Sequence, residues 1–168
     1  KLARPESEVV SIVGDGTYQM LPMELATIVQ EKVKVIFVLL QNYGFASIGA
    51  LSESRGSQRF GTKYRQRGEG SHLADEQVID GVDIAANARS WGLDVLEVHT
   101  IEEFKEAYRK AEASDRPTMI HIETDLYGPN PPGSSWWDVP VSGVSELEST
   151  QRAYEDYQRD RKPQRHYL

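Results

Sequence analysis

Two short apolar runs with a helical segment between them constrain the fold of this chain more than any other feature. The runs cover residues 9–13 and 35–40, and their apolar residues follow one another largely without alternation. Such runs are typical of strands in a parallel sheet that is covered on both faces. Residues 19–31 carry apolar side chains at helical spacing. The segment therefore predicts two buried parallel strands joined by a helical crossover.

A polar motif closes each of these runs. Gly-Asp-Gly-Thr at 14–17 follows the first and Gln-Asn-Tyr-Gly at 41–44 the second, so that Asp15 and Asn42 lie 27 positions apart. The carboxyl ends of adjacent parallel strands meet at one edge of a sheet, where open α/β sheets bind ligands. Mg²⁺ prefers oxygen ligands and shares its shell with phosphates. Asp15, Asn42 and a nearby backbone carbonyl are therefore a predicted site for a divalent cation that carries a diphosphate.

The residues around Asp15 suit an anion as well as a metal. Gly14 and Gly16 let the backbone approach a phosphate closely, and Thr17 and the first N–H groups of the next helix can donate to its oxygens. Pro22 falls near the first turn of that helix, where its missing N–H costs little. The Gly-Asp-Gly triplet alone more often marks a strand-to-helix turn without a ligand. The second motif at the end of a second strand favours the metal site.

Regular patterns resume after residue 82 and predict an α/β fold. We expect a helix at 83–90, a strand at 93–98, a helix at 100–113 and a strand at 118–123. This order indicates a doubly wound, mostly parallel sheet, incomplete at its N-terminal side, and we expect the chain to be a fragment of a longer protein. The expected domain organisation is a diphosphate- and metal-binding domain at 1–125, with a long loop at 43–80, and an irregular C-terminal extension with a polar helix at 126–168.

The long loop is rich in glycine and arginine. One interpretation is a surface excursion without a ligand, and the other is a loop that covers an anionic or polyhydroxylated substrate. In the C-terminal extension, Trp136 and Trp137 form an aromatic pair in an irregular segment. Such pairs usually anchor a tail on a core or on a partner subunit.

Composition excludes several classes of protein. The chain has no cysteine, which excludes disulfides, zinc–thiolate sites and thiol nucleophiles. Its net charge of −7 argues against binding to nucleic acid. No apolar run approaches the roughly 20 residues that cross a bilayer. With hydrophobic residues at 39% and charged residues at 27%, we expect a cytoplasmic globular enzyme.

The two polar motifs resemble the cofactor-binding motif of thiamine diphosphate enzymes. Most members of that family have two consecutive asparagines, whereas here the first position is Gln41. Further segments resemble the 3D-(3,5/4)-trihydroxycyclohexane-1,2-dione hydrolases of myo-inositol breakdown. These segments are NYGFASIG at 42–49, LSES at 51–54, FGTKYR at 60–65 and SWWDVPV at 135–141. The resemblance covers nearly the whole chain.

The resemblance implies thiamine diphosphate and Mg²⁺ as cofactors. The implied metal ligands are Asp15, the Asn42 side chain and the backbone carbonyl of Gly44. The implied cofactor-binding residues are Gly14, Asp15, Gly16, Thr17, Asn42, Gly44 and Phe45. The implied reaction is hydrolytic cleavage of a ring carbon–carbon bond in the polyhydroxylated cyclic dione, which yields 5-deoxyglucuronate.

The resemblance also implies partners that this sequence lacks. It indicates further N-terminal domains, and an oligomer in which a second subunit completes the active site. The glutamate that activates the cofactor is expected on another domain, so no catalytic residue is assigned here. Glu24 and Glu53 are expected to be ordinary polar positions, and the fragment alone is expected to be inactive.

Two other functions remain open. One is an acetolactate synthase-like carboligase or decarboxylase acting on 2-oxo acids, which would share the cofactor motif; the loop at 47–67 and the double tryptophan argue against it. The other is a non-catalytic α/β binding domain, which would bind neither Mg²⁺ nor diphosphate.

Overall fold

The computed structural model describes residues 1–59, 61–69, 73–79, 82–125 and 138–164. The chain divides into two compact units. The first unit comprises Lys1–Phe45 and Tyr64–Tyr127, and the second comprises Ala46–Lys63 and Gly128–Leu168. Each unit is described by itself below.

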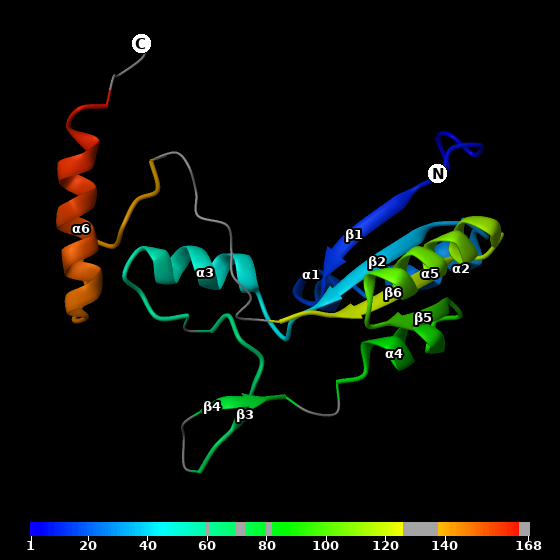
Figure 1. Ribbon diagram of the computed structural model, residues 1–168, viewed down its shortest axis with the longest axis horizontal. Helices are drawn as coiled ribbons and strands as arrows, with labels where there is room; N and C mark the ends of the chain where they lie inside the picture. Colours follow the sequence, from blue (N-terminus) through cyan, green and yellow to red (C-terminus); the bar gives the residue numbers. More distant parts are fainter. Residues whose placement is uncertain (60, 70–72, 80–81, 126–137, 165–168) are drawn as a thin grey trace. The chain divides into compact units, whose positions relative to one another are not determined.

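The first unit is built on a parallel four-stranded sheet (Figure 1). Its strands lie in the order β1-β2-β6-β5, and each neighbouring pair is parallel. The bounds are β1 (Val10–Gly14), β2 (Ile36–Gln41), β5 (Asp94–Val98) and β6 (Thr118–Glu123). The sheet does not close on itself. The α/β fold with a mostly parallel sheet that the sequence predicts is confirmed.

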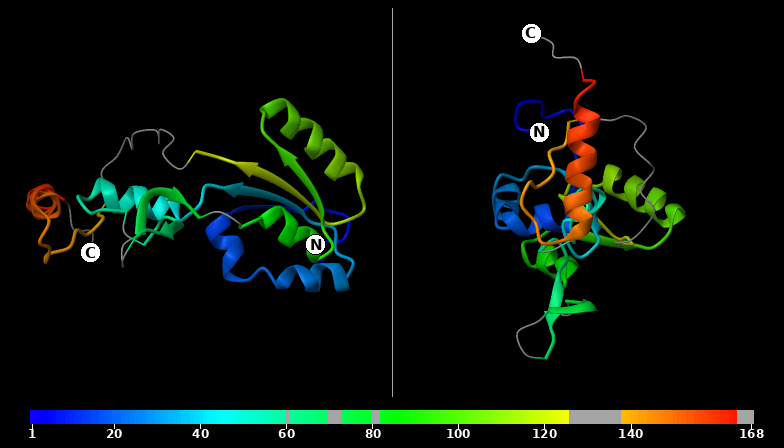
Figure 2. Two further views of the ribbon diagram at one scale, coloured as in Figure 1. Left: turned by 90° about the horizontal axis from the view of Figure 1, so that it is seen from below. Right: turned by 90° about the vertical axis from the view of Figure 1, so that its left-hand side faces the viewer.

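Helices cover this sheet on both faces (Figure 2, left). Tyr18, Leu25 and Ile84 come from three helices and pack with Leu39 and Met119 of the sheet on one face. On the other face, a single helix packs its alanines against strands β2, β5 and β6. The helices are α1 (Asp15–Met20), α2 (Glu24–Gln30) and α4 (Ile84–Ser90) on the first face and α5 (Ile101–Ala113) on the second.

Both helix starts predicted downstream are capped by side chains. The Asp83 carboxylate accepts from Ala86 N at 2.7 Å, and the Thr100 hydroxyl accepts from Glu103 N at 3.1 Å. Each cap satisfies a backbone donor that has no partner inside its helix. Gly92 follows α4 with φ +97°, which is the left-handed C-terminal stop expected there.

The crossover between β1 and β2 differs from its prediction. The single helix expected at 19–31 is wrong, because two short helices, α1 and α2, replace it. Pro22 lies between them, and a proline cannot continue a helix through its own position. The first of these helices begins at Asp15 directly after β1.

Strand β1 is also less buried than its sequence predicts. It lies at the edge of the sheet, and Val10 and Ile12 are 39% and 70% exposed. Helix α5 packs on β2, β5 and β6 and does not reach this strand. The expectation that the first run is buried on both faces is therefore wrong for this structure.

The long loop predicted at 43–80 contains more regular structure than expected. The sequence pattern favours only a short helix around residues 47–52 of this loop, and helix α3 (Ala46–Ser54) is longer at both ends. Two antiparallel strands, β3 (Arg65–Arg67) and β4 (Leu73–Val78), were not predicted. The strands belong to the first unit and the helix to the second.

The second unit joins the residues after α3 to helix α6 (Glu148–Arg161). The hydroxyls of Ser149 and Thr150 donate to Gly56 O at 2.6 and 2.8 Å. Tyr157 of α6 donates to an Asp138 carboxylate oxygen at 2.7 Å. Trp136 and Trp137 lie outside the described residues. Among the residues that are described, no helix has the length and apolar character needed to cross a membrane.

Candidate functional site

The register of strands β1 and β2 brings the two polar motifs together. Gly14 pairs with Leu40, so the chain leaves both strands at the same level of the sheet edge. Asp15 begins α1 at this point, and Asn42 lies in the turn that follows β2. The structure therefore places the two residues side by side at the carboxyl end of the sheet, as the spacing of the motifs predicts.

Asp15 is a buried carboxylate held by backbone donors. It is 1% exposed, and its oxygens accept from Gly16 N at 2.9 Å and from Gly44 N at 3.2 Å. Burial raises the pKa of Asp15 above its usual range, and the backbone N–H donors partly oppose that rise. A carboxylate whose charge is costly in this way is stabilised by a cation beside it.

The Asn42 side-chain amide lies beside this carboxylate. With its N–H group turned inward, the amide donates to Gly44 O at 2.9 Å and to Asp15 Oδ1 at 3.3 Å. Rotation of the amide by half a turn would instead present its oxygen beside the Asp15 and Gly44 oxygens. A cation bound at this point would require that second orientation.

The donor set fits Mg²⁺. It comprises one carboxylate, one amide oxygen and one backbone carbonyl, the oxygen ligands that this ion takes. Three protein oxygens leave the rest of the shell for phosphate and water.

The turn that carries Asn42 has an unusual backbone conformation. Tyr43 has φ +59°, a left-handed conformation that costs a residue with a side chain about 1–2 kcal/mol. Contacts on both sides hold it there: Tyr43 O accepts from Tyr64 N at 2.7 Å, and its hydroxyl donates to Glu123 at 3.0 Å. Burial, and then the Glu123 carboxylate, raise the pKa of Tyr43.

The residues expected to bind the diphosphate differ in how tightly they are packed. A Cβ on Gly16 would lie 2.7 Å from the Phe45 ring, so the glycine is needed for this ring to pack against α1. Gly14 has no such neighbour, since the nearest atom to its Cβ position is 3.9 Å away. Thr17 is exposed on the first turn of α1, where its hydroxyl is accessible to a ligand.

Sequence reasoning missed a buried pair beneath this turn. His121 Nε2 lies 2.7 Å from Gln41 Oε1, and the two residues are 6% and 3% exposed. Burial lowers the pKa of His121, so the imidazole is held in its neutral form. The sequence places His121 within a predicted strand, where a histidine is more often structural, and shows an unusual glutamine at position 41, but it gives no indication that the two are partners.

Glu24 and Glu53 have the ordinary polar contacts that the sequence predicts. Glu53 forms an ion pair with Arg59 at 2.8 Å, and Glu24 accepts from Thr27 at 3.2 Å.

The chain belongs to a family of thiamine pyrophosphate enzyme domains. Its residues 1–122 match the family described as "Thiamine pyrophosphate enzyme, C-terminal TPP binding domain". This match covers the sheet of the first unit and the site at the ends of β1 and β2. The resemblance to thiamine diphosphate enzymes seen in the motifs is confirmed.

Curated relatives with similar sequences indicate one group of enzymes within this family. A 3D-(3,5/4)-trihydroxycyclohexane-1,2-dione hydrolase of Bacillus cereus is 37% identical over 155 residues, which are 92% of this chain and 24% of the relative. The hydrolase of Clostridium perfringens (strain 13 / Type A) is 36% identical over 173 residues, 99% of this chain and 26% of the relative. The chain thus spans about a quarter of the length of these relatives.

Solved structures share the fold. A thiamine diphosphate-dependent 4-hydroxybenzoylformate decarboxylase of Rhodococcus jostii RHA1 superposes with a TM-score of 0.57 at 26% identity, covering 74% of this chain and 21% of that protein. The benzoylformate decarboxylase of Polynucleobacter necessarius gives the same values. Both similarities support the assignment of the sheet to this family's fold.

Proposed function

We propose that this chain is the diphosphate- and Mg²⁺-binding part of a thiamine diphosphate-dependent hydrolase that opens the ring of 3D-trihydroxycyclohexane-1,2-dione to give 5-deoxyglucuronate. The observation that carries the proposal is that the buried Asp15 carboxylate, the Asn42 side-chain amide and the Gly44 backbone lie within hydrogen-bond distance of one another where β1 and β2 end. The names of the curated relatives support the substrate.

Each residue of the site has a role in this proposal. Asp15, the Asn42 side-chain oxygen and Gly44 O would hold Mg²⁺, whose charge would offset that of the diphosphate. Thr17 and the first N–H groups of α1 donate to phosphate oxygens. Phe45 packs against Gly16 and keeps the 42–45 turn close to α1. The buried Gln41–His121 pair fixes the end of β2 from which that turn departs.

Catalysis requires groups beyond these. When bound, thiamine diphosphate supplies the electron sink for cleavage of a carbon–carbon bond next to a carbonyl. The residue that activates the cofactor belongs, in this proposal, to a domain outside this sequence, and a second subunit completes the active site. Because this chain spans about a quarter of its relatives, we expect it to bind cofactor weakly and to turn over nothing by itself.

The test uses the intact polypeptide that contains residues 1–168. It is supplied with thiamine diphosphate and Mg²⁺, and consumption of the trihydroxycyclohexanedione is followed beside a parallel reaction with pyruvate. We expect ring opening that is lost in Asp15→Asn and retained in Asp115→Asn, a matched change at an exposed position. Ring opening that survives in Asp15→Asn, with unchanged cofactor retention, would contradict the metal assignment.

A 2-oxo acid substrate is the second candidate. It is favoured by the structural similarity to enzymes named benzoylformate decarboxylases. Turnover of pyruvate or benzoylformate without ring opening would establish it and would leave the cofactor assignment in place. A non-catalytic binding domain would instead show no affinity for Mg²⁺ with diphosphate.

A further inference from the structure

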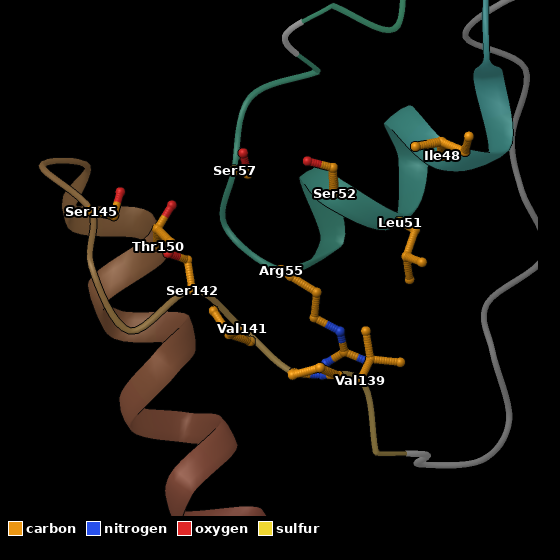
Figure 3. A pocket seen from close by; sticks show the side chains of 11 residues that line it. Ile48, Leu51, Ser52, Arg55, Ser57, Val139, Val141, Ser142, Ser145 and Thr150 are labelled. Carbon is orange, nitrogen blue, oxygen red and sulfur yellow. The ribbon is translucent and has the colours of Figure 1, made fainter.

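The second unit contains a cavity beside helix α3 that the proposed function does not use (Figure 3). This α3 pocket is lined by residues along α3, by Arg55 and Ser57, and by residues between Val139 and the start of α6. Its volume is about 460 Å³, within the roughly 300–1,000 Å³ of pockets that bind small molecules. None of its lining residues belongs to the set assigned above to Mg²⁺ and diphosphate.

Arg55 gives the α3 pocket a donor that needs an acceptor. Its side chain runs from the end of α3 toward Val139 (Figure 3). Its Nε atom is shielded from solvent and makes no hydrogen bond to any residue that the structure describes. A ligand in the pocket cannot touch this shielded atom. The guanidinium group to which it belongs lines the pocket and can donate from its terminal nitrogens to a negatively charged oxygen.

The hydroxyl groups of the pocket need hydrogen-bond donors from a ligand, because their own hydrogens are already donated. Ser57 donates its hydroxyl hydrogen to Gln58 O at 3.2 Å, and Thr150 donates to Gly56 O at 2.8 Å. Ser142 likewise donates to Val144 O at 2.7 Å. Each hydroxyl has one hydrogen and two lone pairs, so all three oxygens retain the ability to accept. A ligand that bonds to them must carry donors of its own, and hydroxyl groups are one such kind of donor.

Apolar side chains complete the lining. Leu51, Val139 and Val141 lie between the polar groups, where they can contact the carbon skeleton of a ligand. Arg55 is the one charged residue among those lining this pocket. A single positive charge matches a single carboxylate better than a phosphate, which carries nearly two charges and several acceptor oxygens.

We propose that the α3 pocket binds a small polyhydroxylated carboxylate, a compound of the sugar-acid class. The carboxylate accepts from the Arg55 guanidinium group, and the ligand's hydroxyls donate to Ser57, Ser142 and Thr150. The ring-opened acid of the reaction proposed above belongs to this class. The inference nevertheless rests on the lining of the pocket alone, and its test requires neither cofactor nor turnover, so either proposal can fail without the other.

The test is a binding titration on the intact polypeptide, in the absence of Mg²⁺ and thiamine diphosphate. The probes are D-glucuronate, the neutral polyol myo-inositol, and acetate, which has a carboxylate and no hydroxyl. We expect glucuronate to bind about tenfold or more tightly than either of the other two, because one charge-assisted hydrogen bond is worth that much. Equal binding of myo-inositol, or no binding of glucuronate at millimolar concentration, would overturn the proposal.

Variants locate the binding in the pocket. Arg55→Gln should weaken glucuronate binding about tenfold or more, whereas Arg152→Gln, the same change at an exposed position of α6, should leave it unchanged. Circular dichroism checks that each variant is folded. Ser57→Ala removes an acceptor and keeps the charge, so it should weaken glucuronate and not acetate. Unchanged glucuronate affinity in a folded Arg55→Gln protein would show that the acid binds elsewhere. If Arg55→Gln does not fold, unchanged affinity in Ser57→Ala would show the same.

Discussion

Gln41 and His121 form a buried hydrogen bond, 2.7 Å between Oε1 and Nε2, at the carboxyl ends of two adjacent strands. Gln41 immediately precedes Asn42, and its backbone carbonyl accepts from Thr124 N at 2.8 Å. The bond therefore ties the start of the proposed metal-binding turn to the end of β6. It connects the stability of the sheet to the geometry of the site.

Removing one member of this pair should destabilise the fold. Gln41→Ala leaves the His121 ring nitrogen buried without its partner, and we expect the free energy of unfolding to fall by about 1–3 kcal/mol. Urea denaturation measures this change. Gln30→Ala removes the same group from an exposed position at the end of α2 and should have a much smaller effect. Equal losses in the two variants would contradict a structural role for the pair.

The same pair predicts how stability depends on pH. Burial lowers the pKa of His121 in the folded chain, below the value near 6.5 of an unfolded chain. The unfolded state therefore binds more protons in this range, and acid favours it. The contribution of neutral His121 should be fully present above about pH 6.5 and should be lost as the pH falls through the folded pKa.

Denaturation at a series of pH values tests this dependence. The difference in stability between the natural chain and His121→Asn should shrink as the pH is lowered from 7 toward 5. His99→Asn, a change at an exposed histidine, should give a difference that varies less over the same range. A difference for His121→Asn that does not change with pH would show that the imidazole is not held neutral.

Phe45 packs on Gly16, so a larger residue at position 16 should destabilise the chain, and a smaller residue at position 45 should reduce that destabilisation. A Cβ at position 16 would lie 2.7 Å from the ring, so Gly16→Ala should destabilise the chain by about 1–3 kcal/mol through overpacking. In a Phe45→Leu background the smaller side chain should reduce that cost. The double-mutant cycle, measured by urea denaturation, should give a coupling above about 0.5 kcal/mol. Additive effects would show that the two residues do not contact each other.

Local patterns in the sequence were sufficient to predict much of the first unit. The strand Thr118–Glu123 has the predicted bounds, and the helix after Thr100 begins at its capping residue. These elements depend on residues close together in the chain. The proximity of Asp15 and Asn42 also followed from local patterns, because a parallel crossover between adjacent strands places their carboxyl ends side by side.

Features that depend on distant residues were not predicted. Gln41 and His121 are 80 positions apart, and their contact requires knowing that β6 lies next to β2. Strand β3 has three residues, Arg65–Arg67, too few to show a periodic pattern. The exposure of Ile12 depends on which strand lies at the sheet edge, and an apolar sequence does not give this order.

Alanine substitutions at two glycines of the second unit compare the cost of a left-handed backbone conformation with the added cost of steric overlap. Gly56 and Gly61 both have left-handed backbones, with φ +82° and +71°, but only Gly56 lacks space: its Cβ would lie 2.3 Å from Ser149 O. Gly61→Ala should cost about 1–2 kcal/mol from conformation alone. Gly56→Ala should cost more, because the connection to the start of α6 must move. Thermal unfolding of the two variants compares them, and equal losses would contradict the close approach of Gly56 and Ser149.

Removal of the metal tests most directly whether Asp15, Asn42 and Gly44 bind Mg²⁺. If Mg²⁺ and diphosphate bind the folded chain and not the unfolded one, a hundredfold excess over Kd should raise the free energy of unfolding by about 2.7 kcal/mol. The measurement is the thermal unfolding of the intact polypeptide with Mg²⁺ and thiamine diphosphate, before and after EDTA. Asn42→Ala should abolish the dependence on Mg²⁺, and Gln30→Ala should retain it. If EDTA leaves the stabilisation by thiamine diphosphate unchanged, the diphosphate binds without the cation. The Asn42 amide would then donate to Asp15 and Gly44 and would not bind a metal.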